Sequence, residues 1–287
     1  MIYGVKSQDR AWHFLDRVLH FEKPIVMGIL NVTPDSFSDG GEFYSIDKAA
    51  SHAHQMLANG ATIIDVGGES TRPGSQSVSV EEEIRRVIPM VKELSANHTC
   101  LISVDTQKAE VAQLAIDSGA HIINDISAGT TDKKMLSVIS STGAGFIMMH
   151  MQGLPQTMQD NPHYGNVLTE INTFFTSRLE TAQRAGILES QIVLDPGIGF
   201  GKRLDHNLNI MNNMGAFHIH GRPVLLGASR KSFINLITPS AAADRLGGSI
   251  AAVLASALTD VEIFRVHDVP ETLQALDIFT AIRNHSV

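Results

Sequence analysis

Polar and charged side chains stand at or directly after the ends of short apolar runs along almost the whole sequence. An Asp or Asn at the end of a strand often only caps the next helix or forms a turn, so each of them alone is as readily structural as functional. Together they predict a ring of hydrogen-bonding and charged groups at one mouth of the fold. The members of this ring are Asn31, Asp65, Asp105, Asn124, His150, Asp195, Ser229, Arg230, Lys231, Arg265 and His267.

The carboxylates of Asp105 and Asp195 and the amide of Asn124 indicate what such a ring could bind. A carboxylate only accepts hydrogen bonds, and the edge of a 2-aminopyrimidinone ring offers adjacent N–H donors. The three residues therefore suit a guanine-like or pterin-like heterocycle. A metal site built on the carboxylates, or an acid and base pair, is the alternative for the same residues.

Two long polar segments follow the first two apolar runs. Segment 31–41 is dense in turn-forming and small polar residues, and segment 67–75 combines glycines with Arg72, whose guanidinium can meet an anion. Length and composition of this kind are typical of functional loops. The alternative for each is a solvated surface loop.

Arg265 and His267 stand one residue apart at the end of the last apolar run, so their side chains point the same way in an extended segment. A helix expected to begin near Pro270 would add N-terminal N–H groups. Guanidinium groups and helix N-termini both suit phosphate oxygens, which predicts a diphosphate site here. A structural ion pair of Arg265 is the alternative.

Two patterns suggest sites that their details do not support. The run 195–203 is similar to a nucleotide phosphate loop, but Pro196 occupies the place of its leading Gly and Arg203 that of its closing Ser or Thr. His218 and His220 would share a face if extended, yet no third ligand stands near them, and a surface turn fits them better than a metal site.

The apolar runs that must position these groups alternate with segments of helical period from Pro24 onward. The runs are continuous, as expected for strands that are buried on both faces. Strands are predicted over residues 25–30, 62–66, 101–104, 122–124, 146–149, 192–194, 224–226 and 263–266. Helices are predicted over residues 47–59, 80–95, 109–118, 133–141, 166–185, 205–214, 245–259 and 270–284.

Eight such units predict an α/β fold with a single TIM-type (β/α)8 barrel, for which 287 residues is an ordinary length. One domain is expected over residues 1–287, with residues 1–23 as an N-terminal lead-in that covers the barrel bottom. Functional groups of such barrels lie on the loops after the strands, where the polar ring stands. A doubly wound open sheet is the competing architecture, but eight units favour closure.

Composition narrows the choice of partners and compartment. The 22 basic and 30 acidic residues give a net charge of −8, which repels a phosphate backbone, so nucleic acid is not an expected partner. The single cysteine, Cys100, excludes an intramolecular disulfide and a zinc site built on cysteines. Neither a signal peptide nor an apolar stretch of roughly 18 residues is visible, so no membrane partner is expected and the cytoplasm is the predicted location.

Two segments, 27–40 (MGILNVTPDSFSDG) and 65–74 (DVGGESTRPG), resemble the signature segments of the dihydropteroate synthase family. The resemblance continues in family order through residues 103–106, 123–125, 149–153, 194–197, 229–232 and 265–268. One departure is Ile198, where many members carry a second aromatic residue, although Phe200 is retained. The match covers nearly the whole chain from Pro24 onward.

The resemblance implies the barrel and a step of folate biosynthesis. The pterin-methyl group of 6-hydroxymethyl-7,8-dihydropterin diphosphate would be transferred to 4-aminobenzoate, with Mg2+ as cofactor, giving 7,8-dihydropteroate and diphosphate. It also implies a homodimer formed through helices of the late barrel, where the Ala-rich segment 249–258 could pack closely.

Residue roles follow from the same resemblance. The pterin would be held by Asp105, Asn124, Asp195 and Lys231, with Met149 lining its pocket. The diphosphate would be held by Asn31, Arg265 and His267, with Asn31 also contacting Mg2+. The aminobenzoate side would be formed by Thr71, Arg72, Pro73, Phe200, Ser229 and Lys231. The residues expected to act in catalysis are Asp35, Lys231, Arg265 and His267.

Two other functions are consistent with parts of this pattern. A pterin-binding methyltransferase barrel is similar around the pterin residues but needs neither a diphosphate site nor Ser229-Arg230-Lys231. A catalytically silent barrel would be expected to lose Asp35, Arg72, Lys231 or Arg265, and all four are present. Both alternatives are therefore less consistent with the sequence than the synthase.

Overall fold

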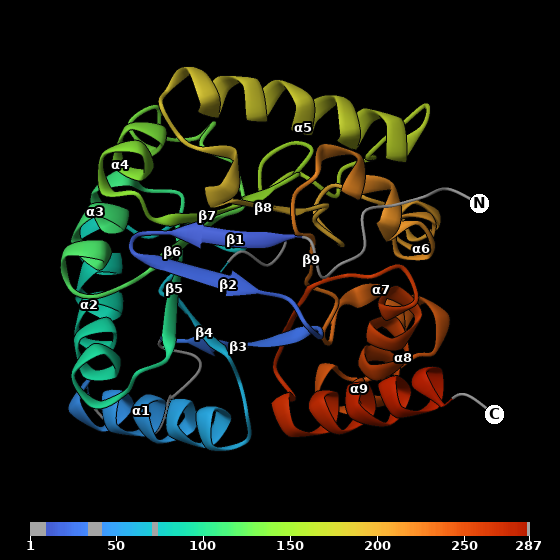
Figure 1. Cartoon of the computed structure of the whole chain (residues 1–287), viewed down its shortest axis with the longest axis horizontal. Coiled ribbons are helices and arrows are strands. Elements are labelled where there is room, and N and C mark those ends of the chain that lie inside the picture. The colour runs from blue at the N-terminus through green and yellow to red at the C-terminus, as the bar shows by residue number, and fades with distance from the viewer. Residues whose placement is uncertain (1–9, 34–41, 71–73, 286–287) are drawn as a thin grey trace.

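A ring of eight parallel strands forms the centre of the molecule in the computed structural model, which describes residues 10–33, 42–70 and 74–285 (Figure 1). All eight strands fall where the apolar runs predict them, because each run is long enough only for a strand and is buried on both faces. The strands are β3 (Ile25–Asn31), β4 (Ile63–Gly67), β5 (Leu101–Asp105), β6 (Ile122–Asp125), β7 (Gly145–Met149), β8 (Ile192–Asp195), β9 (Leu225–Leu226) and β10 (Ile263–Val266).

The strand order shows that this ring is a closed barrel. Neighbouring strands run β8-β7-β6-β5-β4-β3-β10-β9, all parallel, so the chain order continues around the ring without reversing. A parallel bridge between Leu194 of β8 and Val224, directly before β9, closes the circle. A doubly wound sheet reverses its strand order in the middle. The predicted (β/α)8 barrel is therefore confirmed, and the open sheet is excluded.

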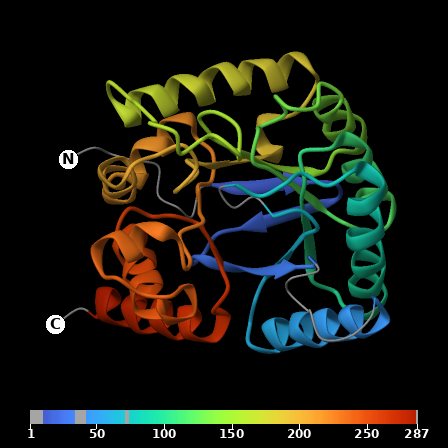
Figure 2. The same ribbon diagram turned by 180° about the vertical axis from the view of Figure 1, so that it is seen from behind.

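Helices surround the barrel on its outside, as the two opposite views show (Figures 1 and 2). Two of them begin with predictable caps, since the side chains of Ser79 and Asn166 accept hydrogen bonds from the backbone N–H groups of Glu82 and Thr169. They are α1 (Glu42–Ala58), α2 (Val80–Asn97), α3 (Ala109–Asp117), α4 (Met135–Thr142), α5 (Val167–Arg184), α6 (Leu204–Asn212), α7 (Ser232–Ile237), α8 (Leu246–Ala257) and α9 (Val269–Asn284).

The helix that the sequence did not predict is α7, because its six residues are too few to show a helical period. Short 3-10 turns at Glu189–Gln191, Met214–His220 and Ala242–Asp244 were not predicted for the same reason. His218 and His220 lie in the second of these turns, where their Nε2 atoms contact Glu262 and the Asn172 amide oxygen rather than a shared ligand.

A β-hairpin covers the end of the barrel at which the strands begin. It consists of β1 (Ala11–Phe14) and β2 (Arg17–His20), and its aromatic side chains Trp12 and Phe14 are buried against each other. With Phe21 they pack on inward-facing residues of the strands, including Met27 and Ile63. The sequence predicts only a lead-in here, because the two strands are four residues each.

The barrel therefore has two chemically different ends. The end under the hairpin is filled with apolar side chains, whereas the polar ring stands at the opposite end, where the strands finish. A larger apolar layer, to which Val26, Leu30, Ile64 and Val66 belong, lies between the strands and the helices. Among the residues that the structure describes, no helix is both long and apolar enough to cross a membrane.

Candidate active site

Arg265 of β10 lies in the polar mouth and connects its strand to β4 and β5, which lie beyond the intervening β3. Its Nε donates to Asp65 Oδ2 of β4 at 2.6 Å, and its Nη2 donates to Asp105 Oδ2 of β5 at 2.8 Å. Asp65 Oδ2 also accepts from Asn124 Nδ2 of β6 at 3.1 Å. The structural ion pair that the sequence offers as the alternative for Arg265 is thus present. The role of Arg265 toward diphosphate stays a prediction.

Burial of this cluster changes its protonation. Burial raises the pKa of Asp105 to about 7, the positive charge of Arg265 opposes that rise, and the neighbouring Asp65 adds to it. The two carboxylates hold the pKa of Arg265 above its ordinary value despite burial. A guanidinium that is always charged therefore lies between two acids, one of which, Asp105, is about half protonated near pH 7.

Asp65 is a buried acid of this cluster to which the sequence assigns no individual role. It is fully buried, and its Oδ1 has no hydrogen-bond partner among the described residues. A buried, incompletely bonded carboxylate is costly unless a cation compensates it, and Arg265 does so from 200 positions along the chain. The available signal was an acid inside an otherwise apolar run.

Asp195 and Lys231 meet on the other side of the mouth, beside Gly227. Asp195 Oδ1 accepts from the Gly197 N–H at 2.7 Å. A Cβ built on Gly227 would lie 3.9 Å from both Asp195 Oδ2 and Lys231 Nζ, and 4.0 Å from the Cβ of Arg265. Gly227 therefore marks the point where these three predicted site residues converge, and a Cβ there would be in ordinary van der Waals contact with each of them.

The charges of this pair depend on each other. Burial lowers the pKa of Lys231 to about 8, and Asp195 opposes that shift. Burial raises the pKa of Asp195, and Lys231 is the first of the groups that oppose it. Lys231 Nζ also donates to the Ile198 carbonyl and lies 4.7 Å from the centroid of the Phe200 ring.

An apolar wall completes this side of the mouth. Met149, from the end of β7, and Phe200, from the loop after β8, are buried in one small cluster with Ile126 and Met158. A flat heteroaromatic ring would find apolar faces here and hydrogen-bonding groups at its edge. Met149, which the sequence assigns to the pterin pocket, and Phe200, which it assigns to the aminobenzoate side, are thus brought together.

Ser229 and His267 form a third group, which links the loop after β9 to the end of β10. Ser229 Oγ lies 3.0 Å from His267 Nδ1 and accepts from the backbone N–H of His267 at 3.2 Å. Between Ser229 and Lys231, Arg230 has a left-handed backbone with φ 58° and makes a two-point ion pair with Asp268. Its N–H donates to Ser249 and its carbonyl accepts from Arg245, so the conformation is held on every side.

Asn31 is the last residue of β3 and lies near the carboxylate cluster that contains Asp105. A Cβ built on Gly67 would lie 3.5 Å from Asn31 Oδ1 and 3.7 Å from the Cβ of Asp105, so the amide is close to the carboxylate cluster. The remaining predicted site residues, Asp35, Thr71, Arg72 and Pro73, lie outside the described residues.

An ion network that the sequence did not predict fixes the start of the 68–75 loop. Lys108, before α3, donates to both Glu69 and Glu83, and Glu83 is almost fully buried on α2. Arg86 of α2 donates to the Gly68 carbonyl at 2.9 Å. A lysine before a helix and an acid in its neighbour carry no sequence pattern, which explains why the network was missed.

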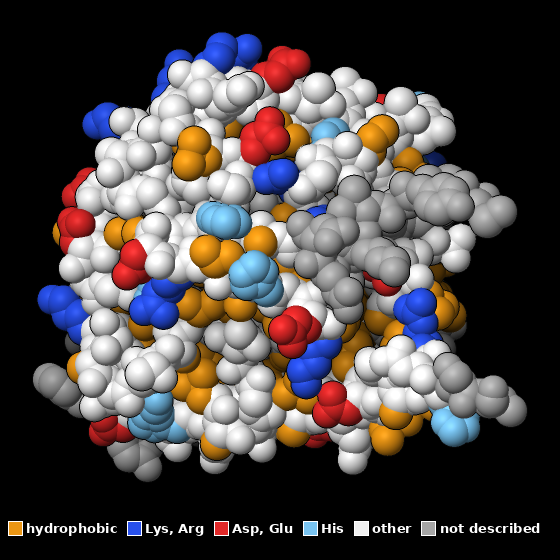
Figure 3. Space-filling view, viewed as in Figure 1, with side chains coloured by type: hydrophobic (Ala, Val, Ile, Leu, Met, Phe, Trp, Pro, Cys, Tyr) orange, Lys and Arg blue, Asp and Glu red, His pale blue; other side chains and the backbone are white. Residues whose placement is uncertain are grey.

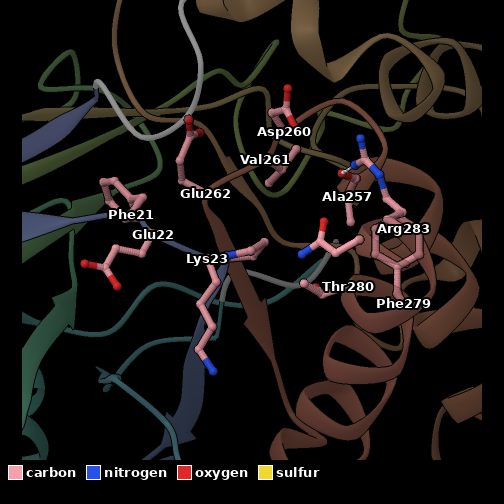
Figure 4. Close-up of a pocket in the computed structure, with 12 residues that line it drawn as sticks. Phe21, Glu22, Lys23, Ala257, Asp260, Val261, Glu262, Phe279, Thr280 and Arg283 are labelled. Carbon is pink, nitrogen blue, oxygen red and sulfur yellow. Dashed lines mark hydrogen bonds between the residues drawn. The ribbon is translucent and has the colours of Figure 1, made fainter. Parts of the chain in front are cut away.

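A shallow depression lies at the other end of the barrel and is not part of this site. Its walls come from the segment before β3, the turn before β10 and the end of α9, with Lys23, Phe279 and Arg283 among them (Figure 4). Figure 3 shows the face that bears the hairpin, where acidic and basic side chains are scattered between small apolar patches. The convergence of charged groups described above is at the opposite end.

Comparisons with known proteins agree with this geometry. Residues 27–267 match the family model described as pterin binding enzyme. Dihydropteroate synthase of Escherichia coli (strain K12) is 47% identical over 92% of this chain and 93% of its own length, and that of Bacillus subtilis (strain 168) is 43% identical over 97% and 95%. The chain therefore belongs to the pterin-binding enzyme family and, within it, to the dihydropteroate synthases.

Solved structures of this family superpose closely on the chain. Yersinia pestis dihydropteroate synthase in a sulfonamide drug complex has a TM-score of 0.91 and 43% identity, covering 96% of this chain and 100% of that one. The Xanthomonas albilineans enzyme with 4-aminobenzoic acid has a TM-score of 0.88 and 40% identity, covering 94% and 97%.

Proposed function

We propose that the mouth of the barrel joins the methyl carbon of 6-hydroxymethyl-7,8-dihydropterin diphosphate to the amine of 4-aminobenzoate, releasing diphosphate and giving 7,8-dihydropteroate. The observation that carries the proposal is the convergence of Asp195, Lys231 and Arg265 around Gly227. Acceptors for a pterin edge, cations for a diphosphate and an apolar wall for the rings meet in one place.

The pterin edge is matched by acceptors on three strands. Asp195 Oδ2 is directed toward Gly227, since Oδ1 is engaged by Gly197. The NH2 of Asn124 faces the acceptor Asp65, which turns its carbonyl oxygen away from Asp65 as a further acceptor. Asp105 adds a second carboxyl group, and Met149 supports the ring face. Donor groups on the 2-aminopyrimidinone edge would bind these oxygens.

The diphosphate is assigned to Arg265, His267 and Asn31. The two ion pairs of Arg265 use Nε and Nη2, so the guanidinium is fixed in the mouth by β4 and β5 before substrate arrives. Ser229 orients the imidazole of His267 through Nδ1. Groups that are already in place stabilise charge developing on a leaving group without reorganising.

The residues present fit a magnesium ion that is held chiefly by substrate. Mg2+ in phosphate-transfer sites keeps several waters and takes one or two protein oxygens in addition to phosphate oxygens. Asn31 Oδ1, at the end of β3 beside the carboxylate cluster, is an oxygen of that kind, and the described residues contain no group of three acidic or histidine ligands that would form a closed metal cage. Bound there, Mg2+ would supply further positive charge for the leaving diphosphate.

The chemical step requires little acid–base work from the chain. The bond between the methylene carbon and the diphosphate oxygen breaks, its electron pair leaves with diphosphate, and the pterin shares the positive charge left on carbon. The neutral arylamine of 4-aminobenzoate then forms the C–N bond and loses a proton. Asp35 is assigned to stabilising the cation, and Thr71, Arg72, Pro73, Phe200, Ser229 and Lys231 to holding 4-aminobenzoate. Closure of the two long loops would keep water from the cation.

The reaction is tested by incubating the chain with both substrates and Mg2+ and measuring 7,8-dihydropteroate and diphosphate. Product is expected only when 4-aminobenzoate is present. Diphosphate release that proceeds equally without the amine would indicate a hydrolase and contradict the proposal. Omission of Mg2+ is expected to slow turnover while the pterin itself still binds.

A homodimer through the late helices is also proposed. The outward face of α8 carries small exposed residues at Gly247, Ala251 and Ala255 and ends in the exposed Leu258, and α7 and α9 lie beside it (Figure 1). Close packing of two such faces would bury these residues together with Leu236 of α7. Light scattering after gel filtration tests this, and Ala251→Arg is expected to give a monomer.

A cytoplasmic location is proposed on the chemistry of Cys100. The single cysteine can form no intramolecular disulfide, and burial raises the pKa of its thiol, which keeps it in the unreactive form. Cell fractionation with an antibody to the chain tests this assignment.

A further inference from the structure

A buried asparagine at the start of α6 holds the loop that follows β8. Asn207 is only 4% exposed, and both polar atoms of its side chain are hydrogen-bonded. Its Oδ1 accepts from the Gly199 N–H at 2.8 Å. Its Nδ2 donates to the Lys202 carbonyl at 3.2 Å and to the Arg203 carbonyl at 2.9 Å. Because two carbonyls need donors and one N–H needs an acceptor, these partners fix the direction in which the amide faces.

The Gly199 N–H belongs to a peptide group that also contacts Lys231. The other half of this peptide is the Ile198 carbonyl, which accepts from Lys231 Nζ. A trans peptide is a rigid plane whose C=O and N–H point in opposite directions. Asn207 therefore lies on one side of the peptide and Lys231 on the other. The bond to Asn207 fixes the direction in which the carbonyl meets the lysine.

The backbone at this position needs such a partner. Gly199 has a φ of 82°, and glycine has wide conformational freedom because it has no Cβ. Rotation of the peptide before it would turn the Ile198 carbonyl away from Lys231. A donor N–H would then face a lysine nitrogen that carries donors of its own. The Asn207 side chain opposes this rotation.

Three consecutive residues of the loop line the Lys231 side chain. The Ile198 carbonyl accepts from Nζ, and a Cβ built on Gly199 would lie 3.4 Å from Lys231 Cδ. The centroid of the Phe200 ring lies 4.7 Å from Nζ. The position of segment 198–200 therefore determines where the lysine nitrogen stands in the mouth.

Asn207 also has a local role in its own helix. Its backbone N–H and its Nδ2 both donate to the Arg203 carbonyl, four residues earlier, at the start of α6. This role uses the side-chain nitrogen, whereas the contact with Gly199 uses the side-chain oxygen. Because the two roles use different atoms, substitutions can separate them.

We propose that Asn207 is a positioning residue for Lys231, which it places in the mouth through the Ile198–Gly199 peptide without touching substrate. The importance of this for catalysis rests on the proposed function, in which Lys231 holds 4-aminobenzoate. An asparagine that serves only the start of α6 would affect stability and would leave Lys231 in place.

Two substitutions separate the roles. Asn207→Ser has a side chain one bond shorter, which can donate to the carbonyl four residues earlier but cannot reach the Gly199 N–H. Asn207→Asp retains an acceptor for the Gly199 N–H and loses both donors. The serine variant is therefore expected to release Lys231, and the aspartate variant to keep it in place although its own stability falls.

The position of Lys231 is measured without substrates. Each folded variant is treated at neutral pH with a limiting amount of acetic anhydride, and mass spectrometry gives the acetylation of Lys231 relative to Lys23, whose side chain is 68% exposed. This ratio is expected to rise severalfold in Asn207→Ser and to stay near the wild-type value in Asn207→Asp. An unchanged ratio in the serine variant would overturn the inference.

Steady-state kinetics test the consequence for the reaction. Asn207→Ser is expected to lower kcat/KM for 4-aminobenzoate about tenfold, because a group that is out of place loses much of its effect. Asn207→Asp is expected to stay within about threefold of wild type. Losses of kcat/KM that follow the stability of both variants would overturn the positioning role. A wild-type chain that forms no product would contradict the proposed function, while the labelling ratios would still test the contact.

Asn209→Ser is the matched control, since it is the same substitution at an exposed position of α6, where the side chain accepts from Asn213. Its labelling ratio and its kcat/KM are expected to equal those of wild type. If neither variant of Asn207 folds, hydrogen exchange of the Gly199 amide in wild type decides the matter. Slow exchange is expected, and exchange at the rate of an exposed amide would overturn the inference.

Discussion

At the scale of single residues, two aspartates are assigned opposite duties. Asp195 is assigned to the pterin in the ground state, whereas Asp35 is assigned to the cation that exists only after the C–O bond breaks. Asp195→Ala is therefore expected to weaken pterin binding about 10- to 100-fold, the value of a hydrogen bond to a charged group. Asp35→Ala is expected to lower kcat by at least as much while the pterin dissociation constant changes less than about threefold. Calorimetry and steady-state kinetics separate the two, and equal losses of binding would contradict the assignment.

The pKa of Lys231 predicts how activity changes at alkaline pH. Burial lowers its pKa to about 8, and the ammonium form is the one that interacts with anionic groups in the mouth. Activity that requires this charge is present below about pH 8 and is lost as pH rises through it, so kcat/KM should fall on the alkaline side. Lys231→Arg is expected to remove this fall, because a guanidinium stays charged. An alkaline limb that is unchanged in the arginine variant would assign it to another group.

Gly227 offers a test of where the pterin binds. A leucine at this position would place its side chain between Asp195 and Lys231, where a Cβ has room but a longer chain occupies the predicted pterin site. Gly227→Leu is expected to abolish pterin binding, whereas Gly227→Ala, whose Cβ keeps ordinary van der Waals distances, should retain a measurable part of it. Both should unfold close to the wild-type temperature. Normal binding by the leucine variant would place the pterin elsewhere.

At the scale of the elements, the sequence was a good guide to the strands and a poorer one to what joins them. Each apolar run became a strand of the barrel, because burial on both faces leaves a continuous pattern. Short elements such as α7 and the β1–β2 hairpin were not predicted, since their formation depends on packing against distant residues. The helix α1 begins at Glu42, five residues before the predicted start at Asp47.

The site, like the fold, was predicted in part from the sequence. Residue types at strand ends predicted that Asp105, Asn124, Asp195 and Arg265 would meet, because all parallel strands finish at one end of a barrel. Which of them would pair could not be predicted, since the Arg265 and Asp65 contact spans 200 positions and depends on the pairing of β10 with β3, which brings it near β4. Lys108 was missed because a buried lysine has no sequence pattern of its own.

The ion network at the start of the 68–75 loop yields a prediction about this element. Lys108→Met leaves the buried carboxylate of Glu83 without its cation, which costs about 3–5 kcal/mol when one partner of a buried pair is removed. The double variant Lys108→Met with Glu83→Met removes both charges and is expected to recover much of that loss. Chemical unfolding measures both, and an unchanged midpoint for the single variant would show that the network contributes nothing to stability.

At the scale of the whole molecule, the barrel separates stability from function along its axis. The hairpin and the apolar side chains beneath it close the end where strands begin, while the charged cluster with its costly buried acids occupies the end where they finish. Packing at the closed end contributes free energy that offsets the burial of charge at the other. A change at the closed end should therefore alter stability and leave the chemistry unchanged.

Trp12 is the residue with which to test this separation. Its side chain is fully buried in the closed end, packs on Phe14 and donates to the Gln191 carbonyl at 2.7 Å. Trp12→Ala is expected to cost about 3–5 kcal/mol, which lowers Tm by roughly 5–8 °C in a chain of this size. At 25 °C the folded fraction should retain wild-type kcat/KM and pterin affinity. Val18→Ala in the same hairpin is the matched control, because Val18 is 49% exposed and its truncation should shift Tm by less than about 2 °C. A Trp12 variant whose kcat/KM falls in step with its stability would show that the two ends of the barrel are coupled.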